Sequence, residues 1–281
     1  MKRSAGKKTQ GSAPGEGGTA AAGSSTARRS STRRWISAAA MVAVVFVLAG
    51  LVGTVVRDHK SKQLAPPASA GGPSALAVPV YGHAPVTLTL YEDMRDPATL
   101  AFSQTYDETL AKLIASGTVN VLYRETAGVD AAKGGTGSLN AGNALGCAQD
   151  LKLFTPYRAV LLQNQPDESN DAFADKATLV TLAKQVKKLD TDVFRACLDK
   201  GQHNVWVKDS TSDFKTANLG TSPVLTMQLL GDAEPHTVYD ATTKPSPKQL
   251  VSMVMAAAQT APTASPTATP TPSPTPSPTN S

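Results

Sequence analysis

The sequence predicts one α/β domain that carries a helical insertion and follows a single membrane-spanning helix. Two apolar segments with strand-like patterns, residues 86–91 and 119–123, flank a helical pattern, and two strands joined through a helix form a parallel βαβ unit. Residues 35–56 contain no charged side chain over 22 positions, a length that is sufficient to cross a bilayer. A long and mostly helical stretch, residues 138–211, then separates the βαβ unit from the C-terminal part.

The N-terminal arm, residues 1–34, carries eight Lys or Arg residues against one acid and almost no apolar side chains. We expect it to be disordered. Because Arg33 and Arg34 directly precede the apolar segment, the positive-inside rule explains these charges more simply than nucleic-acid binding does. The pattern therefore predicts a cytoplasmic N-terminus, a single-pass helix in the cell membrane, an extracellular domain and no nucleic-acid partner.

The apolar segment has a competing interpretation as a cleaved signal peptide. Its apolar run is longer than the usual hydrophobic region of a signal peptide, and the best small-residue site, residues 68–70, lies downstream across a charged stretch. A retained single-pass anchor is favoured.

Two segments poor in apolar patterning border the expected domain, residues 85–259. Residues 57–84 are rich in Pro and Gly and predict a flexible linker. Residues 260–281 form a Pro, Ser and Thr tract, which predicts an extended and unpacked tail. The tail is either a spacer or an O-glycosylated or wall-binding segment, and the spacer is favoured.

The elements of the domain follow in order from the pattern. Residues 86–91 alternate with period two, which is typical of a strand. Asp96 and Pro97 form an N-cap followed by a proline at the first helical position, and apolar residues continue at helical spacing up to Gly117. Beyond the second strand and the helical insertion, the chain predicts a third strand after Gly220, a closing hairpin, and a last helix at 246–258.

The stretch from Tyr91 to Thr99, YEDMRDPAT, resembles the DsbA-like branch of the thioredoxin superfamily, whose members read roughly E-D-F-x-C-P-x-C here. The insertion is similar too: NALGCA, YRAVLLQNQP and FRACL appear in the order found in those proteins. The resemblance covers most of residues 86–258 and implies a thioredoxin-like fold with a helical insertion. Asp96 and Thr99 occupy the two cysteine positions, so the reactive dithiol is missing and a degenerate enzyme is expected.

The resemblance also assigns a role to Ser222 and Pro223. Thioredoxin-like proteins place a cis-proline at this point, beside the active-site helix, and the neighbouring backbone pairs with an extended substrate chain. Asp96, Pro97, Ser222 and Pro223 are therefore the candidate binding residues, with β-augmentation as the mode. The alternative is that Pro223 only preserves the turn.

The sequence contains two cysteines, Cys147 and Cys197, both within the insertion. In an oxidising compartment such a pair normally forms a disulfide. Their spacing excludes a C-x-x-C motif, and relatives carry a second, non-catalytic bridge, so a structural disulfide is favoured over a redox-active pair.

Other chemistry finds little support in the pattern. The four histidines are scattered without metal-ligand spacing, and the glycine-rich stretch 134–138 lacks the lysine of a P-loop, so we expect neither a metal nor a cofactor. Paired catalytic carboxylates are one interpretation of the acidic residues Glu92, Asp93 and Asp96. A buried acid plus a helix N-cap explains them better.

Three functions remain open at this stage. The favoured one is a membrane-anchored thioredoxin-like protein that lacks the dithiol and binds an extended polypeptide or an envelope partner near Asp96 and Pro223. The second is a thiol-disulfide oxidoreductase or isomerase that uses Cys147 and Cys197. The third is a purely structural envelope protein.

Overall fold

The computed structural model of the chain describes residues 65–71, 73–80 and 84–260. The expected arm at 1–34, the expected membrane helix at 35–56 and residues 261–281 of the tail lie outside the described residues. Among the residues that are described, no helix combines the length and the apolar character needed to cross a bilayer.

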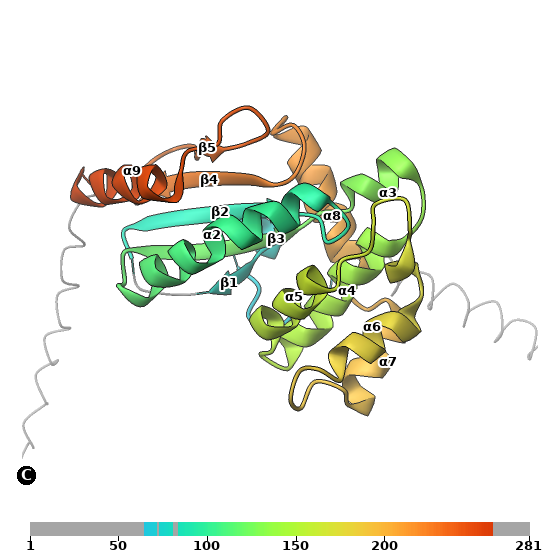
Figure 1. The fold of residues 1–281 in the computed structure, drawn as a ribbon. Coiled ribbons are helices and arrows are strands. Elements are labelled where there is room, and N and C mark those ends of the chain that lie inside the picture. Colours follow the sequence, from blue (N-terminus) through green and yellow to red (C-terminus); the bar gives the residue numbers. More distant parts are fainter. Residues whose placement is uncertain (1–64, 72, 81–83, 261–281) are drawn as a thin grey trace, which may run out of the picture. The chain divides into compact units, whose positions relative to one another are not determined.

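A five-stranded sheet with the order β1-β3-β2-β4-β5 forms the centre of the domain (Figure 1). Its strands are β1 (Val78–Val80), β2 (Val86–Glu92), β3 (Val119–Glu125), β4 (Val224–Leu229) and β5 (His236–Tyr239). The pair β2 and β3 is parallel, as the βαβ pattern predicts, and the other neighbours are antiparallel. The closing hairpin predicted for the C-terminal part is the pair β4 and β5.

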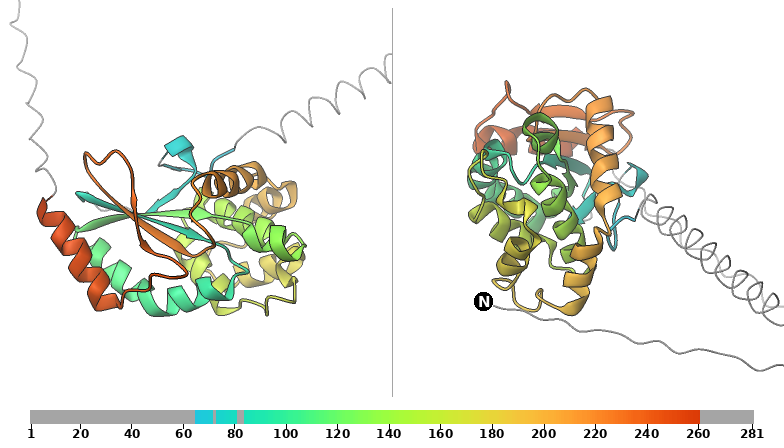
Figure 2. Two further views of the ribbon diagram at one scale, coloured as in Figure 1. Left: turned by 90° about the horizontal axis from the view of Figure 1, so that it is seen from above. Right: turned by 90° about the vertical axis from the view of Figure 1, so that its right-hand side faces the viewer.

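Two helices, α2 (Pro97–Ala115) and α9 (Pro247–Thr260), lie side by side against one face of the sheet (Figure 2). The helical insertion gathers at one end of the sheet and returns to it through its last helix, which contacts β3 (Figure 1). Its elements are α3 (Gly128–Lys133), α4 (Gly137–Asp150), α5 (Phe154–Gln163), η2 (Ala172–Ala174), α6 (Lys176–Ala183), α7 (Asp192–Lys200) and α8 (Asn204–Thr216). The domain is thus an α/β fold with a helical insertion, as expected, and the insertion is longer than the predicted 138–211.

Helix α4 is the centre of the insertion, and α5, α7 and α8 pack around it. Small side chains on α4 permit this close packing. A Cβ atom on Gly146 would lie 2.8 Å from the ring of His203, and one on Gly142 would lie 2.9 Å from Val207. Glycine at these two positions is therefore required for α8 to approach α4.

The prediction of a flexible linker over 57–84 is wrong for residues 65–71 and 73–80. The strand β1 adds to the edge of the sheet beside β3, and the short 3-10 helix η1 (Pro73–Ala75) precedes it. Leu76 and Val78 are buried in the core, and the indole N–H of Trp206 donates to the carbonyl oxygen of Ala75 at 3.2 Å. Pro79 is tolerated because the strand is short and lies at the sheet edge. The folded domain therefore begins before residue 85.

The Cys147–Cys197 pair is a disulfide that joins α4 to α7, with the two Cα atoms 5.9 Å apart. Both residues are buried, with 1% and 6% of their surface exposed. A bond that closes a loop of 50 residues between buried helices fits a structural role.

We expect the Cys197→Ala variant to lose about 2–5 kcal/mol of unfolding free energy, because the unfolded chain regains the loop entropy that the bond removes. Urea unfolding followed by the fluorescence of the buried Trp206 measures this loss. Mass spectrometry of the unreduced parent should find the two cysteine peptides linked. Free thiols at both positions in protein isolated from cells would contradict the assignment.

Candidate functional site

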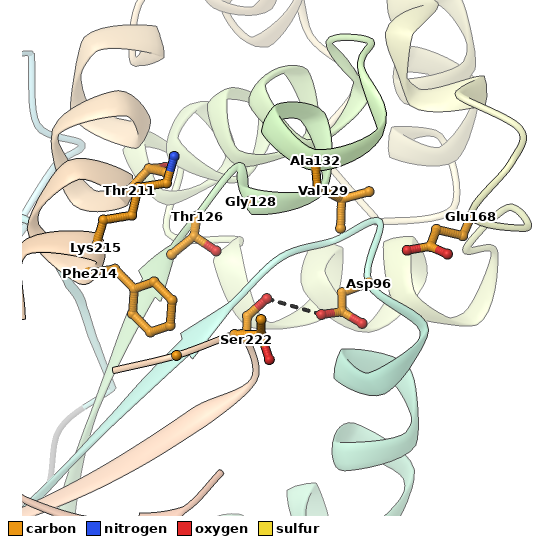
Figure 3. Close-up of a pocket in the computed structure, with 12 residues that line it drawn as sticks. Asp96, Thr126, Gly128, Val129, Ala132, Glu168, Thr211, Phe214, Lys215 and Ser222 are labelled. Atoms are coloured by element: carbon orange, nitrogen blue, oxygen red, sulfur yellow. Dashed lines mark hydrogen bonds between the residues drawn. The ribbon is translucent and has the colours of Figure 1, made fainter. Parts of the chain in front are cut away.

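Asp96 begins helix α2 as its N-cap, and Pro97 occupies the first helical position, both as predicted. The Oδ1 atom of Asp96 accepts the N–H of Ala98 at 2.9 Å, and its Oδ2 atom accepts the hydroxyl of Ser222 at 3.1 Å (Figure 3). Burial raises the pKa of Asp96, and these two hydrogen bonds partly oppose the rise because they favour the carboxylate. The side chain thus links the N-terminus of α2 to the loop before β4.

Thr99, at the second cysteine position, is fully buried one helical turn further along α2. Its hydroxyl oxygen accepts the N–H of Asp93 at 3.3 Å, and its own N–H donates to the carbonyl oxygen of Asp96 at 2.9 Å. Neither contact presents a reactive group to solvent. The two positions that the resemblance assigns to cysteines therefore hold a helix cap and a core hydroxyl.

The insertion fixes the loop between β2 and α2 in place. Arg95, which is buried, forms ion pairs with Asp130 at 2.7 Å and with Asp171 at 3.0 Å. The side-chain amide of Gln165 donates to the carbonyl oxygen of Asp96 at 3.0 Å. Because charge-assisted and amide contacts hold the loop from two sides, the position of Asp96 does not depend on its own cap alone.

The Ser222–Pro223 peptide bond is cis, as the resemblance implies. This bond lies opposite the N-terminus of α2, because the hydroxyl of Ser222 donates to the carboxylate of Asp96 at 3.1 Å. Within the part of the chain that the structure describes, the backbone N–H and carbonyl groups of Thr221 and Ser222 take part in no hydrogen bond. The loop thus offers free backbone groups next to Asp96.

A cavity of about 280 Å³ opens at this point, between the loop before β4, helix α3 and helix α8. Phe214 and Val129 form apolar walls on opposite sides, with Asp96 and Glu168 at one end and Lys215 at the other (Figure 3). The predicted site residues Asp96 and Ser222 line it. Pro97 and Pro223 adjoin these two in the chain but are not among the lining residues.

Sequence reasoning missed the cavity residues that the insertion supplies. Thr211, Phe214 and Lys215 come from α8, and Glu168 comes from the loop after α5. Val207, Thr211 and Phe214 recur every three or four positions along α8, and such spacing in a sequence predicts one buried helix face. All three are buried in the structure. The spacing predicts burial but does not say which part of the chain the face meets.

The acids just before the site are structural. Glu92 is fully buried, and the guanidinium of Arg158 donates to both of its carboxylate oxygens at 2.7 and 3.0 Å from Nε. Asp93 accepts the N–H groups of Val129 and Arg95, each at 2.9 Å, and burial raises its pKa to about 6. These contacts fit the interpretation of a buried acid near a helix cap rather than paired catalytic carboxylates.

Glu125 lies beside Glu92 because the two residues are in register on the parallel strands β2 and β3. It is fully buried, and neither of its oxygens has a hydrogen-bond donor among the described residues. Burial and the neighbouring charge of Glu92 raise the pKa of Glu125 well above its ordinary value. The fold therefore favours the protonated form of Glu125 over the carboxylate.

This arrangement predicts how stability depends on pH. Since the folded-state pKa of Glu125 is raised, its contribution is fully present below the unfolded-state pKa and is lost as pH rises toward the folded-state pKa. When the pH is raised from 5 to 8, we expect the unfolding free energy of the Glu125→Gln variant to fall by less than that of the parent. Urea unfolding at both values measures the difference. Equal losses in the two proteins would contradict a raised pKa of Glu125 in the fold.

Cys147, Cys197 and His203 place their potential ligand atoms within 4.8 Å of one another. The two sulfurs are bonded to each other, and the ring nitrogens of His203 contact the carbonyl oxygen of Ala65 at 2.6 Å and Asp150 at 3.0 Å. All of these atoms already have partners, so the group is not arranged to hold a cation.

A sequence model of the thioredoxin family matches residues 79–238, more than half of the chain, and the chain therefore belongs to this family. The match begins within β1, in agreement with a domain that starts before residue 85. None of the curated proteins is similar enough in sequence to match the chain.

Solved structures place the fold in the DsbA-type branch. Reduced DsbA from Mycobacterium tuberculosis is 20% identical, with 69% of this chain and 87% of that chain covered and a TM-score of 0.51. MdbA, a thiol-disulfide oxidoreductase from Actinomyces oris, is 19% identical, with 73% and 97% covered and a TM-score of 0.51. The alpha-DsbA1 protein of Wolbachia pipientis is 13% identical, with 68% and 94% covered and a TM-score of 0.53. At these identities the likeness establishes the fold alone.

Proposed function

We propose that this chain is a membrane-anchored, extracytoplasmic thioredoxin-like protein that binds an extended polypeptide, or an envelope partner through such a segment, without exchanging disulfides. The observation that carries the proposal is the carboxylate of Asp96 at the N-terminus of α2, hydrogen-bonded to Ser222. A carboxylate accepts hydrogen bonds at this position but does not attack sulfur, because the nucleophile in disulfide exchange is a thiolate.

Binding of an extended chain is supported by the free backbone groups of Thr221 and Ser222. An extended polypeptide pairs with such groups through its own main chain, and adjacent pockets then select its side chains. The cavity between Phe214 and Val129 lies next to this loop and has apolar walls with a few polar groups, which is the usual character of a binding pocket. Together they support a binding role that needs no reactive cysteine.

The oxidoreductase alternative requires Cys147 and Cys197 to react. They are bonded to each other, buried between α4 and α7, and absent from the lining of the cavity. Reactive cysteines are instead partly exposed and lie in an electropositive environment. The binding role is therefore the better supported of the two.

A crosslinking experiment in intact cells tests the binding role. Ala98 is exposed on the first turn of α2, beside the cavity, and a photo-crosslinking amino acid placed there should capture a partner polypeptide. The matched control carries the same probe at Lys187, an exposed position in the turn between α6 and α7. Equal capture from both positions, or none from Ala98, would favour the purely structural alternative.

Membrane anchoring is a separate part of the proposal and has its own expected result. Eight basic residues before the apolar segment and three shortly after it place the N-terminus in the cytoplasm. Protease added to intact spheroplasts should remove the domain, residues 65–260, and leave the N-terminal arm protected. A domain that stays protected until the membrane is dissolved would show that the orientation is wrong.

A further inference from the structure

The cavity beside Asp96 continues along helix α8. A second hollow of about 430 Å³ shares Thr211 and Lys215 with it and is also lined by Lys208. Because Thr211 and Lys215 line both, the two hollows are neighbours on α8, and we call the pair the α8 groove, with Asp96 and Ser222 in the first hollow and Lys208 in the second. The two volumes together offer room for more than one side chain of a polypeptide.

The charges of the α8 groove are divided between its ends. Asp96 and Glu168 stand at the end near Ser222, and Figure 3 shows Lys215 above Phe214, on the opposite side of the cavity from Asp96 and Glu168. Lys208 lies seven positions before Lys215 on α8, two helical turns away and on the same face. The groove is therefore acidic at one end and basic at the other.

Most other charges around the groove already have partners. Asp130, on the wall of the second hollow, pairs with Arg95 and accepts two backbone N–H groups. Glu168 lies 3.7 Å from Lys133, a half-exposed contact that neutralises it in part. In the described part of the chain, no ion pair involves Asp96, Lys208 or Lys215. These three are the charges left for a ligand.

The surroundings of Asp96 also favour the binding of a positively charged side chain. Burial raises the pKa of Asp96, the hydrogen bonds from Ala98 and Ser222 oppose this rise, and the like charge of Glu168 adds to it. A positive charge beside Asp96 would favour the carboxylate. A basic side chain entering between Phe214 and Val129 would place its methylene groups on apolar walls and its charged end at Asp96. An aliphatic side chain would leave Asp96 uncompensated.

We propose that the α8 groove selects an extended segment with one basic side chain at Asp96 and acidic side chains further along, facing Lys215 and Lys208. The proposal rests on the polypeptide-binding function and adds the chemistry of the segment. Seven helical positions separate the two lysines by about 10 Å along the helix. Three residues of extended chain span about the same distance, so the two acids should be three residues apart.

Synthetic peptides test the proposal with the full chain in detergent micelles. The probes are fluorescein-labelled twelve-residue peptides of Ala, Ser and Gly that carry one Arg and two Glu three residues apart, with the Arg before the acids in one and after them in the other. Controls are a peptide with Gln for both Glu and one in which the two Glu flank the Arg directly. Fluorescence anisotropy should show tighter binding of at least one probe than of both controls, weakened by salt.

Variants of the chain then assign the charges. Lys215→Glu is at an exposed position and should fold, and it should weaken probe binding about 3- to 5-fold while restoring binding of a peptide with Lys in place of Glu. Asp96→Asn should weaken binding of the Arg probe more than it weakens binding of a peptide with Gln in place of the Arg. Lys187→Glu, an exposed charge change outside the groove, should have no effect.

The outcomes separate this proposal from the function on which it rests. If all peptides bind equally and Lys215→Glu has no effect, the charge selection is overturned while polypeptide binding stands. If no peptide binds, the selection is overturned, and capture by the Ala98 probe in cells decides the function independently. The proposal is supported if Lys215→Glu binds the probe more weakly than the parent and binds the peptide with Lys in place of Glu more tightly than the parent does.

Discussion

Replacing Asp96 and Thr99 by cysteine is expected to give the chain a disulfide-oxidase activity that the parent lacks. The two positions are one helical turn apart at the start of α2, with Pro97 already between them. A thiolate at the N-terminus of a helix is stabilised by free N–H groups and by the helix dipole, which lowers the pKa of the thiol. The cis peptide bond before Pro223 already faces this point.

The surroundings of the two positions favour this result. Asp96 is partly exposed and lines the cavity, so a thiol there is accessible. Thr99 is fully buried, and a buried second thiol is protected from competing reactions. The loop that carries position 96 is held by Arg95 and Gln165 through contacts that do not involve the Asp96 side chain. The substitution therefore should not displace the loop.

Oxidation of a model dithiol peptide by the purified chain measures the activity. The Asp96→Cys, Thr99→Cys variant should oxidise the peptide above background, while the parent and the Asp96→Cys single variant should not complete a cycle. Activity in the parent that disappears on removal of Cys147 would overturn the degenerate-site interpretation, because the active site would then lie in the insertion.

The part of the fold that local patterns determine was predictable. Residues 86–91 alternate because buried and partly exposed positions alternate along β2, which packs against α9. Asp96 accepts the N–H of Ala98 in the first turn of α2, and Pro97 fixes the backbone there. Strand β1 was missed because its three residues contain Pro79 and follow a Gly- and Pro-rich stretch. Its pairing with β3 is a long-range contact, and no local propensity records it.

Some residues of the candidate site were likewise predictable from the sequence, and others were not. Asp96, Ser222 and Pro223 were found through the family resemblance, and the structure brings Asp96 and Ser222 within hydrogen-bonding distance. Phe214 and Lys215 were not found, since they are distant in the sequence and reach the cavity only because α8 returns to β3. The direction in which a returning helix turns its side chains is set by packing, and the sequence pattern of α8 alone does not determine it.

The largest effect on stability is expected from Arg158. Its guanidinium binds both oxygens of Glu92, donates to Asp107 at 2.7 Å, and lies 5.0 Å from the centre of the Tyr123 ring. It is the cation that balances Glu92, a fully buried carboxylate that also neighbours Glu125. Removing one partner of a buried ion pair leaves an uncompensated charge and costs about 3–5 kcal/mol.

The Arg158→Met variant, which keeps much of the side-chain volume, should therefore unfold about 10 °C or more below the parent at neutral pH. Without the guanidinium the folded-state pKa of Glu92 rises further above its unfolded value, so the deficit should shrink as pH falls toward 5. Adding Glu92→Gln to Arg158→Met should recover part of the loss, since it removes the buried charge.

The matched control for Arg158 is Arg195→Met, which breaks an ion pair with Asp190 in which the arginine is half-exposed. Water reaches both side chains of this pair, so the unfolding temperature of Arg195→Met should stay close to that of the parent. If Arg158→Met also unfolds near the parent temperature, Glu92 must accept a proton in the fold without cost. The ion pair would then not be what holds the insertion to the end of β2 beside the candidate site.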